Sequence, residues 1–169
     1  MNLYILRHGD AGPNSASAAD DDARVLTDAG RIGVSQIAAL ARSAGLTPPT
    51  IILSSPLPRA QQTAEIAMAE WGTNAEIRSS NSLVRGDILA MMSEITNLYP
   101  EHHAVLLAGH EPSLSTLASA ILSGNERSFI ELDKAGLIHL SVYSCEPMRM
   151  RGYLRMYLSP SHLKGRTGA

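Results

Sequence analysis

Two histidines and two arginines stand where apolar segments of the chain end. Arg7 and His8 follow the run LYIL, Arg59 follows TIILSSPLP, and His110 follows AVLLAG. Arginine presents a planar fork of N–H donors that matches phosphate oxygens in pairs, and it keeps its proton at working pH. A neutral imidazole is a nucleophile. If folding brings these four side chains together, they form a site that binds an anion and reacts with it.

The elements that must position these residues are strands followed by turns. The apolar runs at 2–7, 50–54 and 104–109 have the composition of buried strands, and helices are expected after the last two. In open parallel α/β sheets, ligands bind in the crevice beyond the carboxyl ends of the strands. Helix N-termini at that edge add backbone N–H groups and the positive end of the helix dipole. The pattern therefore predicts one anion site and not three unrelated motifs.

The rest of the chain continues this alternation of strand and helix. Residues 9–24 read as a loop, and the segments 137–143 and 152–158 alternate like strands with no helix between them. We therefore predict a three-layer α/β/α fold with a mainly parallel central sheet, in which at least one of the last two strands can run antiparallel. Helices are expected at 28–44, with Thr27 as the cap, and from Pro56 to Trp71, with Ser55 as the cap. Two further helices are expected at 87–98 and 112–122, and a weak strand at 75–78.

Length and composition narrow the class of protein. The 169 residues predict a single domain over 1–158, followed by a frayed tail over 159–169. The net charge of -2 argues against nucleic acid as a partner, and the single Cys145 excludes an internal disulfide or a cysteine metal cluster. No signal peptide and no apolar run near the roughly 20 residues of a membrane helix are found, so a cytoplasmic monomer without a membrane partner is expected.

The charges around the histidines indicate how they would act. Two nearby guanidinium groups repel an imidazolium, which lowers the pKa of His8 and His110, so both should be neutral near pH 7. One histidine can then attack phosphorus and form a phosphohistidine intermediate, while the other hydrogen-bonds the non-bridging oxygens. Which ring nitrogen attacks is left open by the sequence.

These motifs together resemble the histidine phosphatase superfamily, also called the phosphoglycerate-mutase-like family. The Arg-His-Gly signature is Arg7-His8-Gly9, the Ser-Pro-x-x-Arg-Ala-x-Gln-Thr segment runs from Ser55 to Thr63, and the Gly-His motif is Gly109-His110. The RHGDA start, the R-x-L-T-x-x-G segment from Arg24 to Gly30, the late LSPSHLK and the short length resemble the small bacterial phosphohistidine phosphatases of the SixA type.

The resemblance implies a metal-independent phosphatase that needs no cofactor. It implies that His8 is the nucleophile and that Arg7, Arg59 and His110 are catalytic and form the phosphate pocket. It also implies further phosphate or substrate contacts, which fall on three residues of the loop after the first strand. These are Gly9, expected to let backbone approach the ligand closely, Asn14 and Arg24.

The chain departs from the family at the acidic residue that protonates the leaving oxygen. The corresponding region reads NSLVRGD and has no glutamate, so the candidate acids are Asp87, Asp10 and Glu111, each expected first in a structural role. A phosphate ester needs such an acid, whereas an imidazole leaves with its second nitrogen already protonated. We therefore expect the chain to hydrolyse phosphohistidine on a signal-transduction protein, for example on a histidine phosphotransfer domain.

Three alternatives remain open at this point. The first is a phosphatase of small phosphate monoesters that uses Asp87 or Asp10 as its acid. The second is a non-catalytic module that binds phosphate or a phosphoprotein, which the pair His8 and His110 argues against. The third is a metal site built from the six histidines, which lacks any supporting carboxylate or cysteine spacing.

Overall fold

The computed structural model describes residues 1–146 and 149–163 of the chain. Within these residues six strands form one sheet in the order β3-β2-β4-β1-β5-β6. The first four are parallel, and β5 runs antiparallel to both of its neighbours. The mainly parallel sheet and the antiparallel pairing near its end are therefore confirmed. The strands are β1 Asn2–Arg7, β2 Ile51–Ser54, β3 Glu76–Ser79, β4 Ala104–Gly109, β5 Leu137–Ser144 and β6 Arg151–Leu158.

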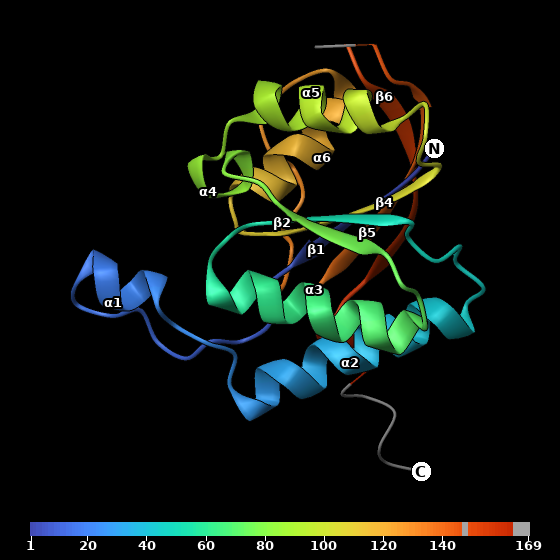
Figure 1. Cartoon of the computed structure of the whole chain (residues 1–169). Helices are drawn as coiled ribbons and strands as arrows, with labels where there is room; N and C mark the ends of the chain where they lie inside the picture. The colour runs from blue at the N-terminus through green and yellow to red at the C-terminus, as the bar shows by residue number, and fades with distance from the viewer. Residues whose placement is uncertain (147–148, 164–169) are drawn as a thin grey trace.

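Helices cover both faces of the sheet and complete the predicted three layers (Figure 1). Helices α2 (Asp28–Ser43) and α3 (Pro58–Trp71) lie on one face. Helices α4 (Ser82–Arg85), α5 (Ile88–Leu98) and α6 (Ser113–Ser123) lie on the other. Side chains of β1 alternate between the two apolar cores, which is why the strand reads as an uninterrupted apolar run: Tyr4 and Leu6 join one core, and Leu3 and Ile5 join the other.

Two predicted helix caps are confirmed and one is wrong. The Thr27 side chain accepts a hydrogen bond from the Gly30 N–H at the start of α2, and Asp87 accepts one from the Ala90 N–H at the start of α5. Ser55 does not cap α3, which begins at Pro58 with no side-chain cap. The Ser55 hydroxyl accepts from the Leu57 N–H inside a turn that delays the helix by two residues relative to the prediction.

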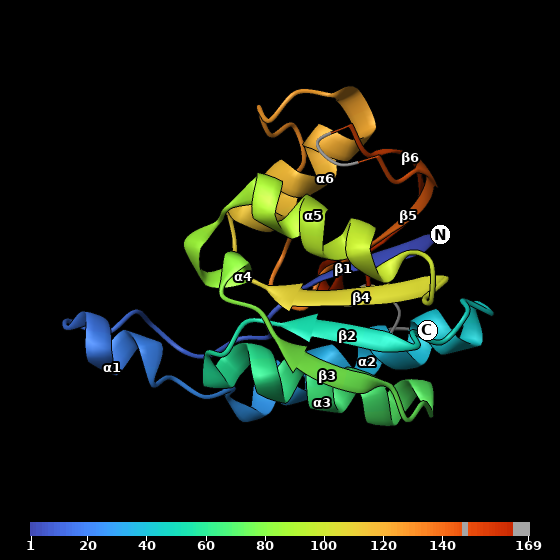
Figure 2. The same ribbon diagram turned by 45° about the horizontal axis from the view of Figure 1, so that its top comes forward.

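The segment predicted as a loop over 9–24 contains a short helix, α1 (Ala18–Asp22). Its sequence AADDD has no apolar periodicity, so hydrophobic pattern could not reveal it. Ser17 caps it by accepting from the Asp20 N–H. The helix buries none of its residues and projects beyond the carboxyl ends of the parallel strands (Figure 2). A polar arm therefore stands beside the edge where the predicted site residues lie.

Close backbone packing fixes the turn after β1. A Cβ added to Gly30 would lie 2.1 Å from the Asp10 carbonyl oxygen, and one added to Gly9 would lie 2.6 Å from the Gly30 carbonyl oxygen. Only glycines permit this approach of the turn to α2. The close neighbour of Gly9 in the structure is α2, and the predicted approach of a ligand to Gly9 stays a prediction. This close contact between the turn and α2 restricts the backbone next to His8.

The predicted tail begins with an ordered turn. Ser159 is buried, and residues Pro160–His162 form a 3-10 helix, η1. A cavity of about 630 Å³ lies between α2 and η1, and neither histidine of the predicted site lines it. Residues 164–169 lie outside the described part of the chain. Among the residues that are described, none of the helices has the length and apolar character needed to span a membrane.

Candidate active site

The pairing of three neighbouring strands determines where the site residues lie. In the register of β1 and β4, Arg7 stands opposite Gly109, so His8 and His110 leave the sheet side by side. Their ring centroids are 5.0 Å apart. On the other side of β4, strand β2 leads through its turn to Arg59 in the first turn of α3. The structure thus brings the two histidines and the arginines to one edge of the sheet.

His8 is buried and has a defined proton arrangement. Its Nδ1 lies 2.7 Å from the Gly9 carbonyl oxygen, and because a carbonyl oxygen only accepts, Nδ1 carries the hydrogen. The lone pair is then on Nε2. Burial lowers the pKa of His8 to about 4, with further lowering from the charges of Arg59, Arg7 and Arg24. His8 is therefore neutral at pH 7, with its free lone pair on Nε2.

His110 has the complementary arrangement. Its Nε2 lies 2.8 Å from the Ser55 hydroxyl oxygen, which already accepts from the Leu57 N–H and can donate its own proton to the ring. The other nitrogen, Nδ1, is buried and has no hydrogen-bond partner among the described residues. Burial lowers the pKa of His110 to about 3, followed by the effects of His8 and the arginines. A neutral His110 held this way presents Nδ1–H as a donor.

Arg7 and Arg59 use their donors in the same way. One terminal nitrogen of Arg7 donates to the Leu132 carbonyl oxygen at 2.8 Å, and one of Arg59 donates to the Asp21 carbonyl oxygen at 2.8 Å. In the described part of the chain, the Nε of each is buried without a hydrogen-bond partner. Each guanidinium therefore keeps one edge for an acceptor that the protein does not supply. Two such edges beside two neutral imidazoles fit a tetrahedral oxyanion.

Arg24 differs from these two arginines because both of its terminal nitrogens donate hydrogen bonds within the protein. Its Nε forms an ion pair with a carboxylate oxygen of Asp21 at 3.0 Å but, among the described residues, makes no hydrogen bond. One terminal nitrogen donates to the carbonyl oxygens of Ala11 and Gly12. The other terminal nitrogen donates to Asp21 and to the Asn14 side-chain oxygen, each at 3.2 Å. Asn14 therefore contacts Arg24 rather than either histidine. Arg24 still acts at a distance, because its charge lowers the pKa of both His8 and His110.

Comparison with known proteins places the chain in a family. A sequence profile described as the histidine phosphatase superfamily (branch 1) matches residues 3–83, which include Arg7, His8 and Arg59. An uncharacterized protein of Picosynechococcus sp. is 37% identical over 142 residues, which is 83% of this chain and 84% of that protein. The chain belongs to the histidine phosphatase superfamily. This confirms the resemblance predicted from the three motifs.

Solved structures share the fold of this histidine phosphatase at lower identity. The protein histidine phosphatase SixA complexed with tungstate has a TM-score of 0.83 and 23% identity, covering 96% of this chain and 99% of that one. A putative phosphohistidine phosphatase SixA from Agrobacterium tumefaciens has a TM-score of 0.75 and 24% identity, covering 94% and 97%. A mycobacterial glucosyl-3-phosphoglycerate phosphatase has a TM-score of 0.68 and 18% identity, covering 94% and 99%.

The three candidate acids of the phosphatase are engaged elsewhere. Asp87 caps α5, and Asp10 accepts from the Thr27 hydroxyl and forms an ion pair with Lys134, whose hydrogen bond holds the pKa of Asp10 below its usual value. Glu111 accepts from the Ser115 N–H and hydroxyl in the first turn of α6. Burial raises the pKa of Glu111. None of the three has a hydrogen bond to either histidine of the site among the described residues.

Sequence reasoning missed two members of the site. Ser55, which we predicted as a helix cap, instead orients His110, and its place one residue after the end of β2 was the available signal. Asp21 binds Arg24 and Arg59, and its position three residues before Arg24 in a short helical turn was the signal for that pair. In the described residues no group of three metal-ligating side chains is found.

Proposed function

We propose that this histidine phosphatase hydrolyses phosphohistidine carried by a protein. The observation that supports the proposal most directly is the state of His8, which is neutral, keeps its Nε2 lone pair free and lies beside two arginines with open edges. A phosphorylated protein, such as a histidine phosphotransfer domain, would be the partner. No cofactor is required by this chemistry.

In the first step, His8 Nε2 attacks phosphorus and the P–N bond to the substrate imidazole breaks. Arg7 and Arg59 bind the non-bridging oxygens, and His110 Nδ1–H donates to them as their charge grows. The substrate imidazole takes the bonding electron pair. If its second nitrogen is protonated, it leaves as neutral imidazole and needs no acid from the enzyme.

In the second step, water attacks phosphorus and His8 is released. The phosphorylated His8 ring carries the phosphoryl group on Nε2 and a hydrogen on Nδ1, held by the Gly9 carbonyl oxygen. When the P–Nε2 bond breaks, the ring returns to neutral imidazole, and one proton of the water passes to solvent or to the released phosphate. The His8 imidazole thus leaves phosphorus without help from a carboxylic acid, as proposed for the imidazole of the substrate.

The surroundings of His110 fit an imidazole leaving group. A cavity of about 300 Å³ has His110 in its wall. Apolar side chains (Val84, Ile88 and Pro112) and charged ones (Arg85 and Glu111) line it as well. The carboxylates that could protonate an alkoxide are committed to Ala90, Lys134 and Ser115. Small phosphate monoesters remain the second candidate, because the glucosyl-3-phosphoglycerate phosphatase shares this fold.

Two substrates distinguish the phosphohistidine activity from the monoester activity. Phosphate release should be measured from a histidine-phosphorylated phosphotransfer domain and from a phosphoserine peptide, with wild type and Asp87→Asn. We expect faster release from phosphohistidine and no effect of Asp87→Asn on it. Equal or faster ester turnover that depends on Asp87 would support the monoester candidate. Mass spectrometry after brief mixing with the phosphohistidine donor should find a phosphoryl group on His8.

A further inference from the structure

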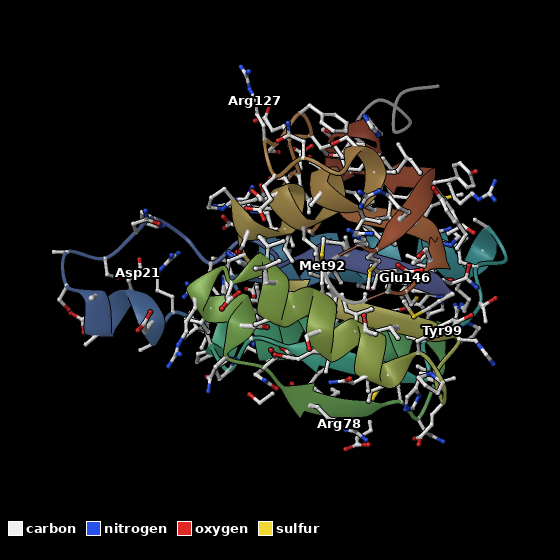
Figure 3. All side chains as sticks on the ribbon, turned by 90° about the horizontal axis from the view of Figure 1, so that it is seen from above. Asp21, Arg78, Met92, Tyr99, Arg127 and Glu146 are labelled. Atoms are coloured by element: carbon white, nitrogen blue, oxygen red, sulfur yellow. The ribbon has the colours of Figure 1, made fainter. Side chains whose placement is uncertain are left out.

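Asp21 is the residue through which the α1 arm contacts the site. Figure 3 shows it on α1, outside the body formed by the sheet and its helices. One carboxylate oxygen accepts from the Ser15 N–H and lies 3.0 Å from Arg24 Nε. The other accepts from Arg24 at 3.2 Å and lies 3.8 Å from a terminal nitrogen of Arg59. The Asp21 carbonyl oxygen accepts from the second terminal nitrogen of Arg59.

These contacts are not explained by the packing of the fold. Helix α1 buries none of its residues, so no apolar core fixes its position. The hydrogen bonds and ion pairs of Arg24 and Arg59 with Asp21 are what connect it to α3 and to the turn after β1. Arg24, through the Asp21 carboxylate, and Arg59, through the Asp21 carbonyl oxygen, are therefore both connected to the peripheral helix by one residue.

The two phosphate-binding arginines are held by different parts of the molecule. Arg7 donates to the carbonyl oxygen of Leu132, a residue with no exposed surface, so the core orients it. Arg59 donates to Asp21 on the exposed arm. The Asp21 carboxylate stays 3.8 Å from Arg59, beyond hydrogen-bond distance, while it pairs closely with Arg24. It thus offsets the charge of Arg24 and leaves the open edge of Arg59 for the ligand.

We propose that Asp21 is a positioning residue that couples Arg24 to Arg59 and directs the open edge of Arg59 toward the phosphoryl group. The proposal builds on the phosphate site proposed above. A carboxylate that only competed with phosphate for Arg59 would contact that arginine closely. Here the close contacts are made with Arg24, and the carboxylate and the carbonyl of one residue hold both arginines in a fixed relation.

The test replaces the carboxylate and leaves the backbone contact intact. Asp21→Asn should bind tungstate and orthophosphate about tenfold more weakly by calorimetry, because without the ion pair to Arg24 the α1 arm no longer fixes the carbonyl oxygen that orients Arg59. With a phosphohistidine protein, the KM should rise more than kcat falls. Asp21→Glu should recover part of the anion affinity. Asp22→Asn is the matched control, since it removes the same charge from the exposed neighbouring position. Asp22 acts on Arg59 through its charge and, among the described residues, makes no ion pair with it, so Asp22→Asn should not weaken anion binding.

The outcomes separate this proposal from its alternatives. Unchanged melting temperature in Asp21→Asn is expected, because α1 buries nothing, and it excludes a general folding defect. Anion affinity equal to that of Asp22→Asn would overturn the positioning role. Tighter anion binding by Asp21→Asn would overturn it too, since that result belongs to a competing carboxylate. Because tungstate binding requires no turnover, a failure of the phosphohistidine proposal would appear separately, as wild type that binds tungstate but does not cleave the donor.

Discussion

Among the described residues, two regions hold buried imidazoles, and one of them carries the site proposed for catalysis. His8 and His110 lie beyond the carboxyl ends of β1 and β4, where three arginines lower their pKa in addition to burial. His139 lies inside β5, where its Nε2 is 3.0 Å from the Asn2 side-chain oxygen and its ring packs 4.8 Å from that of Tyr4. Burial lowers the pKa of His139 as well.

Burial lowers the pKa of the imidazoles in both regions, so burial alone does not distinguish the proposed site from the β5 region. In the β5 region the histidine is paired with an amide and an aromatic ring, and Arg155 is the cation that affects its pKa. At the strand ends, open guanidinium edges add a place for an anion beside the free lone pair of His8. Position along the strand decides this, because a residue just past the end meets helix N-termini and arginines, whereas a residue inside it meets neighbouring strands and the core on its face of the sheet.

Removing one histidine from each region gives the largest expected contrast. His8→Gln should lower phosphate release from a phosphohistidine protein by about a thousandfold or more, because the nucleophile is lost. His139→Gln, which keeps a hydrogen-bonding side chain beside Asn2, should stay within a few-fold of wild type. Rapid-quench measurement of phosphate release checks both. If His8→Gln kept a tenth of wild-type turnover, the nucleophile would have to be sought elsewhere.

Arginines in the two regions should differ nearly as much. Arg59→Lys keeps the charge but removes the planar fork, so kcat should fall about a hundredfold, the usual loss when one transition-state donor is removed. Arg155→Lys, near His139 but distant from the site, should leave kcat unchanged. Steady-state kinetics on the same phosphohistidine protein provides the measurement. Equal effects of the two changes would contradict the role assigned to the open edge of Arg59.

The contrast between strand end and strand interior could be predicted from sequence. Buried parallel strands are apolar throughout, so Arg7, His8 and His110 mark by their polarity where β1 and β4 stop. The three layers and the mainly parallel sheet then follow from the alternation of strand and helix, whereas the strand order was not predicted. The alternating segment with His139 was equally clear as a strand. The fold class and the motifs at the strand ends could therefore be predicted from the sequence.

The partners of those residues could not be predicted, because they come from segments with no periodic signal. Helix α1 has five residues and no apolar face, so the contact between Asp21 and Arg59 across 38 residues had no sequence signature. The use of Ser55 to hold His110, 55 residues away, depends on a two-residue delay in the start of α3. The hydrogen bonds of the Arg24 terminal nitrogens likewise depend on how the 9–24 segment folds back on itself.

Lowering the pH should reduce the stability contributed by the buried histidines of both regions. The folded-state pKa of His8 is about 4, below its ordinary 6.5, so the unfolded chain binds more protons between these values. The resulting stability is present above pH 6.5 and is lost as the pH falls toward 4. His110 and His139 contribute with the same sign.

Activity should follow His8 alone. Turnover should persist from pH 7 to about 5 and then fall about tenfold per pH unit below 4, as the nucleophile is protonated. Urea denaturation across pH should show less acid sensitivity in both His8→Gln and His139→Gln. In the pH–rate profile, His139→Gln should keep the acid limb of wild type. An acid limb near pH 6.5 would mean that His8 is not held neutral by its surroundings.

The smallest expected effect comes from the hydrogen bonds that orient the histidines. Ser55→Ala removes the partner of His110 Nε2, so the ring can turn and Nδ1–H loses its fixed direction; kcat should fall about threefold to tenfold, the equivalent of one lost hydrogen bond. Asn2→Ala removes the corresponding partner of His139 and should reduce stability without changing kcat. The same deletion thus has a kinetic effect in one region and a thermodynamic effect in the other. If Asn2→Ala slowed turnover as much as Ser55→Ala, the sheet would transmit strain to the strand ends, and the two regions would not be independent.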